Sequence, residues 1–184
     1  MSKRIAYLAA AAFSALSLTS TFVAPARAEE KTVMVGGAAM YPSKNIIQNA
    51  VNSKDHTTLV AAVKAAGLVQ TLEGKGPFTV FAPTNAAFGK LPAGTVDNLV
   101  KPENKATLTK ILTYHVVPGK LEASDLKDGQ KLKTVEGEEL TVKKSGSSVM
   151  IVDAKGGTSM VTIPNVNQSN GVIHVVDTVL MPAS

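Results

Sequence analysis

Apolar residues in the first half of the chain recur every three or four positions, which is the period of a helix buried on one side. The clearest such stretch precedes Gly67, a residue type that commonly ends a helix. A second helix is predicted near residues 105–112, and a shorter one over residues 44–51 with Ser43 as its cap. The apolar face before Gly67 consists of Leu59, Ala62, Val63 and Ala66.

The second half of the chain has the pattern of short strands separated by glycine-rich turns. Two earlier strands are predicted at residues 78–82 and 114–117, and the first is apolar enough to be buried on both faces. Thr84 is placed to cap a short helix that extends through Phe88. The later strands are predicted at residues 131–134, 139–143, 149–152, 160–163 and 172–176. Helices followed by strands favour the α+β class over an alternating α/β sheet.

The beginning of the chain has the composition of a secretory signal peptide. Lys3 and Arg4 precede an apolar stretch over residues 5–18, and Ala-Arg-Ala at residues 26–28 supplies the small residues that signal peptidase requires. We therefore expect residues 1–28 to be removed and the remainder to be secreted or periplasmic, with no stable membrane insertion. The alternative is an uncleaved anchor, but serine, threonine and proline interrupt the roughly 20 apolar residues that a spanning helix needs.

The part of the chain after the predicted signal is nearly neutral and has no cysteine. The full sequence has 19 basic and 14 acidic residues, and three of the basic ones lie in the signal. Charges of both signs alternate along the rest, which argues against a nucleic-acid partner. Without disulfides the hydrophobic core must stabilise the fold, and about 150 residues can bury roughly 70% of the unfolded surface. We expect a single domain over residues 44–184, preceded by an arm or linker over residues 29–43.

Three motifs follow one another along the chain in a characteristic order. The first is GPFTVFAPTNAAF at residues 76–88, the second is LTYHVVPG at residues 112–119, and the third is NGVIHVVD at residues 170–177. They resemble the first homology box, the Tyr-His motif and the second homology box of the fasciclin domain, and the resemblance covers residues 45–182. It implies a fasciclin-like wedge of two packed β-sheets with helices along one side. It also implies an extracellular or periplasmic adhesion module with no general catalytic activity.

Several residues of these motifs have structural explanations of their own. The phenylalanines supply most of the aromatic bulk in a chain without tryptophan, and Asn170-Gly171 suits a tight turn that leads into the last strand. The resemblance also points to candidate partner-binding residues. Tyr114 and His115 match the Tyr-His motif, although a core role is favoured for both, and Asn165-Val166 takes the place of an Asp-Ile pair. Because the carboxylate is lost there, an integrin-type contact through a metal is not expected. The structural motif residues are Phe78, Phe81, Thr84, Phe88 and His174.

His115 and His174 each lie in an apolar segment, so we expect buried, neutral imidazoles that bond to the backbone. His174 and Asp177 are three apart in a predicted strand and therefore face opposite sides, which excludes a local pair. Together with His56 these histidines lack the short spacing of a metal site, so no metal and no cofactor are expected.

The sequence favours a non-catalytic adhesion or binding module of the cell surface, envelope or extracellular matrix, with a protein or polysaccharide as partner. The alternative is a periplasmic small-molecule-binding protein or enzyme that uses a pocket near His115 and His174. A converging set of polar groups in a concave site would favour the alternative. The ligand and the oligomeric state stay open at this level.

The signal-peptide pattern predicts a mature protein that begins at Glu29. N-terminal sequencing of the extracytoplasmic protein should read Glu29, Glu30 and Lys31 in succession. Ala28→Glu removes the small residue before the cleavage site, and should cause the precursor to accumulate. A wild-type chain that begins at Met1 in a membrane fraction would contradict cleavage.

Overall fold

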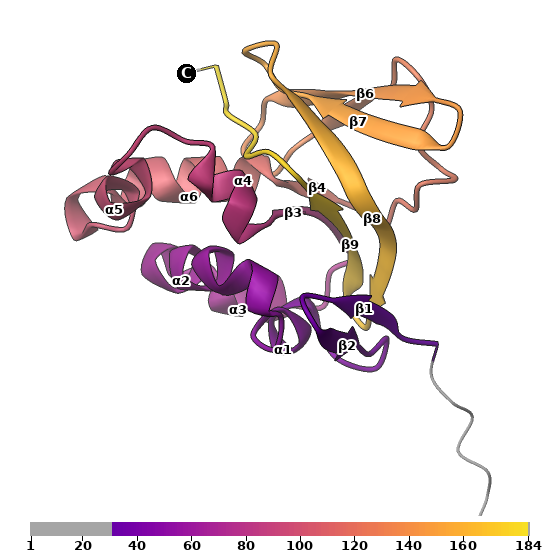
Figure 1. Cartoon of the computed structure of the whole chain (residues 1–184), viewed down its shortest axis with the longest axis horizontal. Helices are drawn as coiled ribbons and strands as arrows, with labels where there is room; N and C mark the ends of the chain where they lie inside the picture. Colours follow the sequence, from indigo (N-terminus) through magenta and orange to yellow (C-terminus); the bar gives the residue numbers. More distant parts are fainter. Residues whose placement is uncertain (1–30, 184) are drawn as a thin grey trace, which may run out of the picture.

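The computed structural model describes residues 31–183, which place helices on one side and a strongly bent β-sheet on the other (Figure 1). The predicted signal peptide, residues 1–28, lies outside the described residues. Helices followed by strands make the fold α+β, as the order of predicted elements indicated. The helices are α1 (Ile46–Ala50), α2 (Thr57–Ala66), α3 (Val69–Glu73), α4 (Asn85–Gly89), α5 (Thr95–Leu99) and α6 (Lys105–Tyr114), with 3-10 turns at Lys54–His56 and Pro102–Asn104.

The main sheet has seven strands in the order β4-β3-β9-β8-β7-β6-β5, and β1 and β2 form a separate hairpin. β3 and β9 run parallel, whereas the other neighbours in the sheet are antiparallel. The strands are β1 (Val33–Val35), β2 (Ala38–Met40), β3 (Phe78–Pro83), β4 (Val116–Pro118), β5 (Lys131–Lys133), β6 (Glu139–Ser145), β7 (Ser148–Val152), β8 (Thr158–Gln168) and β9 (Gly171–Val176).

β8 is the strand at which the sheet bends (Figure 1). Its residues 158–160 pair with β7, its residues 161–168 pair with β9, and the pairing with β9 shifts register twice. Such irregularities bend a strand and increase its twist. The two halves of the sheet consequently face each other, and they form the expected wedge of two packed sheets.

Two hydrophobic cores lie on opposite faces of the β3–β9 pair. Phe81 and Val176 face the core between the two halves of the sheet, whereas Val80 and Ile173 face the helices. β3 is therefore buried on both faces, as its uninterrupted apolar sequence predicted. Phe88 from α4 belongs to the core on the helical side.

The helix boundaries follow local capping chemistry. α2 ends at Gly67 with φ 72°, as predicted, because glycine enters the left-handed region without steric cost. Thr84 caps α4 as predicted, with its hydroxyl accepting the Ala87 N–H at 3.2 Å. The predicted cap at Ser43 is wrong. Asn45 caps α1 instead, and it exchanges reciprocal hydrogen bonds with Gln48 at 2.8 and 3.0 Å in a capping box.

The segment predicted as an arm or linker forms the β1–β2 hairpin. Gly36 and Gly37 connect its strands with φ 56° and 77°, the geometry of a two-residue turn that suits glycine at both positions. Val35 and Met40 are buried in the core on the helical side. The linker interpretation is therefore wrong from residue 33 onward, since the hairpin covers one end of that core.

The strand predicted over residues 114–117 begins only at Val116. α6 continues through Tyr114, and His115 caps its C-terminal end. The His115 ring bonds to the carbonyl of Ile111, four residues earlier, and so satisfies a helix-end acceptor that has no regular backbone donor. Helix and strand thus meet within the Tyr-His motif.

Phe81→Ala and Phe88→Ala should each lower the free energy of unfolding by about 3–5 kcal/mol, because each removes an aromatic ring from one of the two cores. Urea denaturation of the purified mature protein measures the change. Val135→Ala is the control, since Val135 is 44% exposed and its truncation should cost no more than about 0.5 kcal/mol. Losses below about 1 kcal/mol at both phenylalanines would contradict the packing described above.

Candidate functional site

The three sequence motifs converge around the β3–β9 pair. Phe78 pairs with Gly171 at one end of the parallel ladder, and Phe81 pairs with His174 further along. The Tyr-His motif lies beside them, because the His115 carbonyl accepts the Phe81 N–H at 2.9 Å. Segments almost a hundred residues apart in sequence therefore form one continuous structural unit.

Gly171 allows the two strands to approach closely. A Cβ atom at this position would collide with the carbonyl oxygen of Phe78. The preceding Asn170 is buried and ties three segments together, since its side-chain amide donates to the carbonyls of Leu72 and Gly74 at 2.7 and 2.8 Å and its oxygen accepts the Ile46 N–H at 3.1 Å. The Asn-Gly pair, predicted as a turn, thus also anchors α1 and α3 to the sheet.

His174 is fully buried, and both of its ring nitrogens are paired. Nδ1 accepts the backbone N–H of Asn165 at 3.3 Å, so Nε2 carries the proton and donates to the carbonyl of Leu121 at 2.8 Å. The ring stacks on Phe81 with 5.7 Å between centroids. Burial lowers its pKa, although the Leu121 carbonyl and the charge of Glu122 oppose the shift. His174 is therefore a neutral bridge between β9, β8 and the Leu121 loop.

His115 has the same kind of buried environment, but it lies at the C-terminal end of a helix and not in a strand. Nε2 accepts the Leu180 N–H at 3.0 Å, so Nδ1 carries the proton and donates to the Ile111 carbonyl at 2.8 Å. Burial lowers the pKa of His115 to about 4, against opposing effects of the Ile111 carbonyl and Asp153. The ring joins the end of α6 to the C-terminal segment, and neither nitrogen is left for an external group.

The other candidate partner-binding residues are also largely occupied within the fold. The Tyr114 hydroxyl accepts the Ala154 N–H at 2.8 Å and donates to the Glu139 carbonyl at 3.3 Å, and burial raises its pKa to about 12. Val166 is buried in the core on the helical side. Asn165 is half-buried with φ 57°, and its side-chain oxygen accepts the Ala123 N–H at 2.7 Å. Tyr114, His115 and Val166 are therefore not presented on the surface described by residues 31–183.

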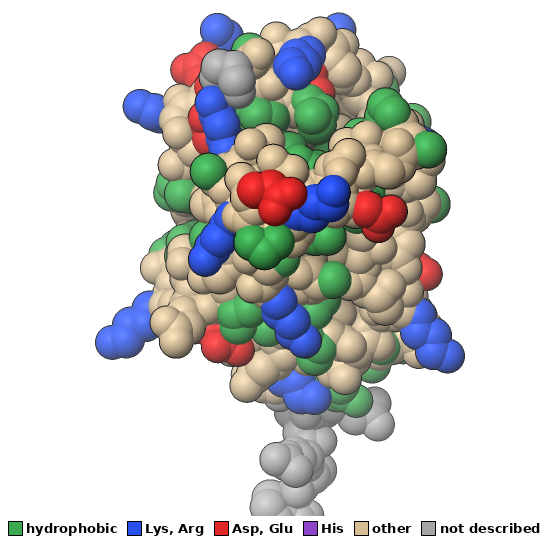
Figure 2. All heavy atoms as spheres, turned by 90° about the vertical axis from the view of Figure 1, so that its left-hand side faces the viewer, with side chains coloured by type: hydrophobic (Ala, Val, Ile, Leu, Met, Phe, Trp, Pro, Cys, Tyr) green, Lys and Arg blue, Asp and Glu red, His purple; other side chains and the backbone are tan. Residues whose placement is uncertain are grey.

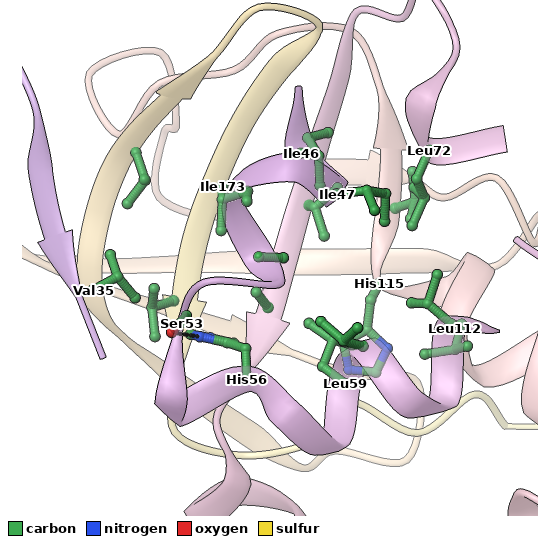
Figure 3. Close-up of a pocket in the computed structure, with 18 of the residues that line it drawn as sticks. Val35, Ile46, Ile47, Ser53, His56, Leu59, Leu72, Leu112, His115 and Ile173 are labelled. Carbon is green, nitrogen blue, oxygen red and sulfur yellow. Dashed lines mark hydrogen bonds between the residues drawn. The ribbon is translucent and has the colours of Figure 1, made fainter. Parts of the chain in front are cut away.

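The structure separates the two histidines of the alternative small-molecule hypothesis. His115 lines an apolar cavity of about 40 Å³ between the helices and the sheet (Figure 3). His174 does not line this cavity, because its ring stacks on Phe81 in the other core. Residues 31–183 contain no group of three or more His, Cys, Asp or Glu side chains that could hold a metal ion. Among the described residues, His115 and His174 therefore do not meet in one cavity.

Sequence reasoning did not identify the polar end of this cavity. His56 and Ser53 both line it, and Ser53 Oγ lies 2.9 Å from His56 Nδ1 (Figure 3). Burial lowers the pKa of His56, while the Ala82 carbonyl and Asp55 oppose the shift. The available signal was a histidine that lies three residues after a serine, immediately before an apolar helix face.

His115 should make folding stability depend on pH in a way that His115→Gln removes. Its folded pKa of about 4 lies below the ordinary value of 6.5, so its contribution is complete above pH 6.5 and is lost as the pH falls towards 4. Over that range the unfolded chain takes up a proton that the folded chain does not. The free energy of unfolding should therefore fall by about 3 kcal/mol through this one group.

Urea denaturation of both proteins between pH 7 and pH 4 tests this prediction. His115→Gln should be the less stable protein at pH 7, and the difference should narrow as the pH falls, because glutamine does not titrate. His56 and His174 are present in both proteins, so their titration cancels in the comparison. If the difference in the free energy of unfolding between the two proteins stays constant with pH, His115 does not have the lowered pKa described above.

Comparison with known proteins identifies relatives over most of the chain. Residues 54–182 match the family model described as "Fasciclin domain". Protein sll1483 of Synechocystis sp. is 46% identical over 97% of this chain and 95% of its own length. Immunogenic protein MPB70 of Mycobacterium bovis is 35% identical over 95% of this chain and 96% of its own length. Cell surface glycolipoprotein MPB83 of the same species is 39% identical over 80% of this chain and 64% of its own length.

The fold is also similar to that of a solved structure, the FAS1 domain pair of the insect cell adhesion molecule fasciclin I. The TM-score is 0.68 at 19% identity, and the match covers 77% of this chain and 52% of the domain pair. Within residues 31–183 no helix is both long and apolar enough to cross a membrane. The matched residues include the β3–β9 pair, the Tyr-His junction and most of the helical layer, and on these grounds the chain belongs to the fasciclin domain family.

Proposed function

We propose that this chain is an exported, non-catalytic binding module that mediates adhesion at the cell surface, in the envelope or in the extracellular matrix. The names of two relatives support this role, since one is a cell surface glycolipoprotein and the other a cell adhesion molecule. The signal-peptide pattern at the start of the chain supports export. We expect the partner to be a protein or a polysaccharide.

The pairing of the motif histidines inside the fold is the observation that most favours a non-catalytic role. His115 and His174 each use both ring nitrogens in contacts with backbone groups, and burial holds their pKa values below the ordinary range. A general acid or base must reach the proton that it transfers and needs a pKa near the working pH. These histidines meet neither requirement, so partner binding is assigned to the surface.

The described surface suggests where such a partner binds. Charges of both signs are interspersed on the face at the left of Figure 1, without a field of one sign (Figure 2). Three exposed apolar side chains come from the hairpin and the segments next to it, since Met34 lies in β1, Tyr41 directly follows β2 and Val51 caps the C-terminal end of α1. Exposed aliphatic side chains suit contact with a protein, and an exposed aromatic ring suits contact with either a protein or a sugar ring. We therefore assign the contact to this N-terminal surface.

Replacing these three side chains together by serine should weaken binding of the mature protein to a native envelope fraction by at least about ten-fold, since interface anchors commonly contribute more than 1 kcal/mol each. Quantitative sedimentation of labelled protein with the envelope fraction measures the loss. The control carries serine at three other exposed apolar positions, which lie apart from the hairpin: Val100, Val135 and Met160.

Both variants must retain the wild-type urea midpoint. Protease treatment of the envelope fraction should abolish binding if the partner is a protein, and periodate oxidation should abolish it if the partner is a polysaccharide. Equal binding by both triple variants would contradict the assignment of partner binding to the N-terminal surface. Failure of the wild type to bind any envelope or medium fraction would contradict the adhesion role itself.

A further inference from the structure

The cavity on the helical side is lined by residues of α1, α2, α3 and α6, of the hairpin, and of β3, β4, β8 and β9 (Figure 3). Its volume is about 40 Å³, and the described residues that line it have polar side-chain atoms only at Ser53, His56 and His115. His115 is already paired at both nitrogens. The remaining polar pair, Ser53 and His56, lies together at one end of an otherwise apolar lining.

His56 has a hydrogen-bonding capacity that the fold leaves unused. The residue is 3% exposed, and its Nδ1 is paired with Ser53 Oγ at 2.9 Å. Its Nε2 is buried and makes no hydrogen bond of regular geometry among residues 31–183, although the Ala82 carbonyl lies close enough to the ring to raise its pKa. A buried polar atom without a partner is unfavourable. The contrast with His115 and His174, whose nitrogens are all paired, makes His56 exceptional within this protein.

The orientation of the His56 ring is built into the hairpin. Gly36 lies against Ser53, and a Cβ atom on Gly36 would collide with Ser53 Oγ. The Lys54 N–H also donates to the Gly36 carbonyl at 3.2 Å, which ties the turn to the residues just before α2. The hairpin therefore holds Ser53 against Nδ1, and Nε2 is the ring nitrogen that makes no hydrogen bond of regular geometry.

A water molecule is a poor match for this position. Buried waters usually make about three hydrogen bonds, and cavities lined by apolar groups stay dry. Here a single imidazole nitrogen is the side-chain group of the lining without a regular hydrogen bond, and the apolar side chains of the lining come from four helices and six strands. An organic molecule with one polar group and an aliphatic remainder fits both parts of the lining.

We propose that this cavity is a binding site for a small, neutral, aliphatic molecule whose single hydroxyl group hydrogen-bonds to His56 Nε2. A hydroxyl group both donates and accepts, so it pairs with either neutral tautomer of the ring. A carboxylate is disfavoured, because no cationic side chain lines the cavity and an unpaired buried charge is costly. This site is separate from the N-terminal surface proposed for adhesion.

The size of the cavity limits the ligand. A volume of about 40 Å³ corresponds to roughly three water-sized spheres, so the enclosed part accepts a short chain segment. The half-buried residues of the lining are Ala50 of α1, Val60 of α2 and Leu68 before α3, whereas the other lining residues are buried, so an opening to the surface is expected between these three. A longer aliphatic chain would extend through this opening.

Two probes of similar shape test the proposal, 1-butanol and n-pentane, which differ by a hydroxyl group in place of a methyl group. In NMR titrations of the mature protein, with each probe added up to its solubility limit in water, both should shift the methyl signals of Val63 and Ile173 in a saturable manner. Only 1-butanol should shift the His56 Nε2 nitrogen signal. In His56→Phe, which keeps a ring of similar volume, the affinity for 1-butanol relative to n-pentane should fall about five-fold.

Ala50→Leu should block the opening and abolish both titrations, whereas Ala61→Leu makes the same change at an exposed position of α2 and should leave them intact. If His56→Phe does not fold, the Nε2 signal of the wild type still decides the hydrogen bond. Absence of saturable shifts at Val63 and Ile173 with 1-butanol would overturn the proposal. It would also be overturned by binding that leaves the Nε2 signal unchanged.

Discussion

The parallel contact between β3 and β9 is the constraint on which the rest of the fold depends. At its start, Gly171 lets the backbone approach the Phe78 carbonyl so closely that no side chain fits between them. Because both strands are buried on both faces, they separate two hydrophobic cores and belong to each. The helices pack against one face, the β5–β8 half of the sheet folds over the other, and Asn170 ties α1 and α3 to the same point.

Buried histidines recur where the backbone leaves regular structure. His115 joins the end of α6 to the C-terminal segment, and His174 joins the irregular Asn165 region of β8 to the Leu121 loop. A neutral imidazole offers one donor and one acceptor on opposite sides of a rigid ring, which suits two backbone groups that cannot reach each other. Burial keeps these rings neutral. His56 has the same chemistry with one side left open, and this difference separates a structural ring from a candidate ligand contact.

Elements with a strong local signal were predictable from sequence. The face of α2, its end at Gly67, the cap at Thr84 and the doubly buried strand β3 depend on side-chain period and on the conformational preferences of single residues. The β1–β2 hairpin was missed, although Gly36-Gly37 is a hairpin signal, because the flanking strands are short and their partners for burial lie elsewhere in the chain. The strand assigned to Tyr114 and His115 was wrong for a related reason. β-branched neighbours favour a strand locally, but the contacts of Ile111 and Leu180 with the His115 ring extend the helix.

The sequence by itself determined the α+β class, the family and the apolar surroundings of His115 and His174, because these follow from pattern and motif. Only the tertiary structure decided that His115 and His174 face different cores, that Tyr114 and Val166 are buried, and that Nε2 of His56 is left without a partner. Pairing of a polar atom depends on groups that are distant in the chain: the donor for His115 comes from residue 180, and the acceptor for His174 comes from residue 121. Local sequence encodes which groups need partners, whereas the packing of the whole chain determines which of them find one.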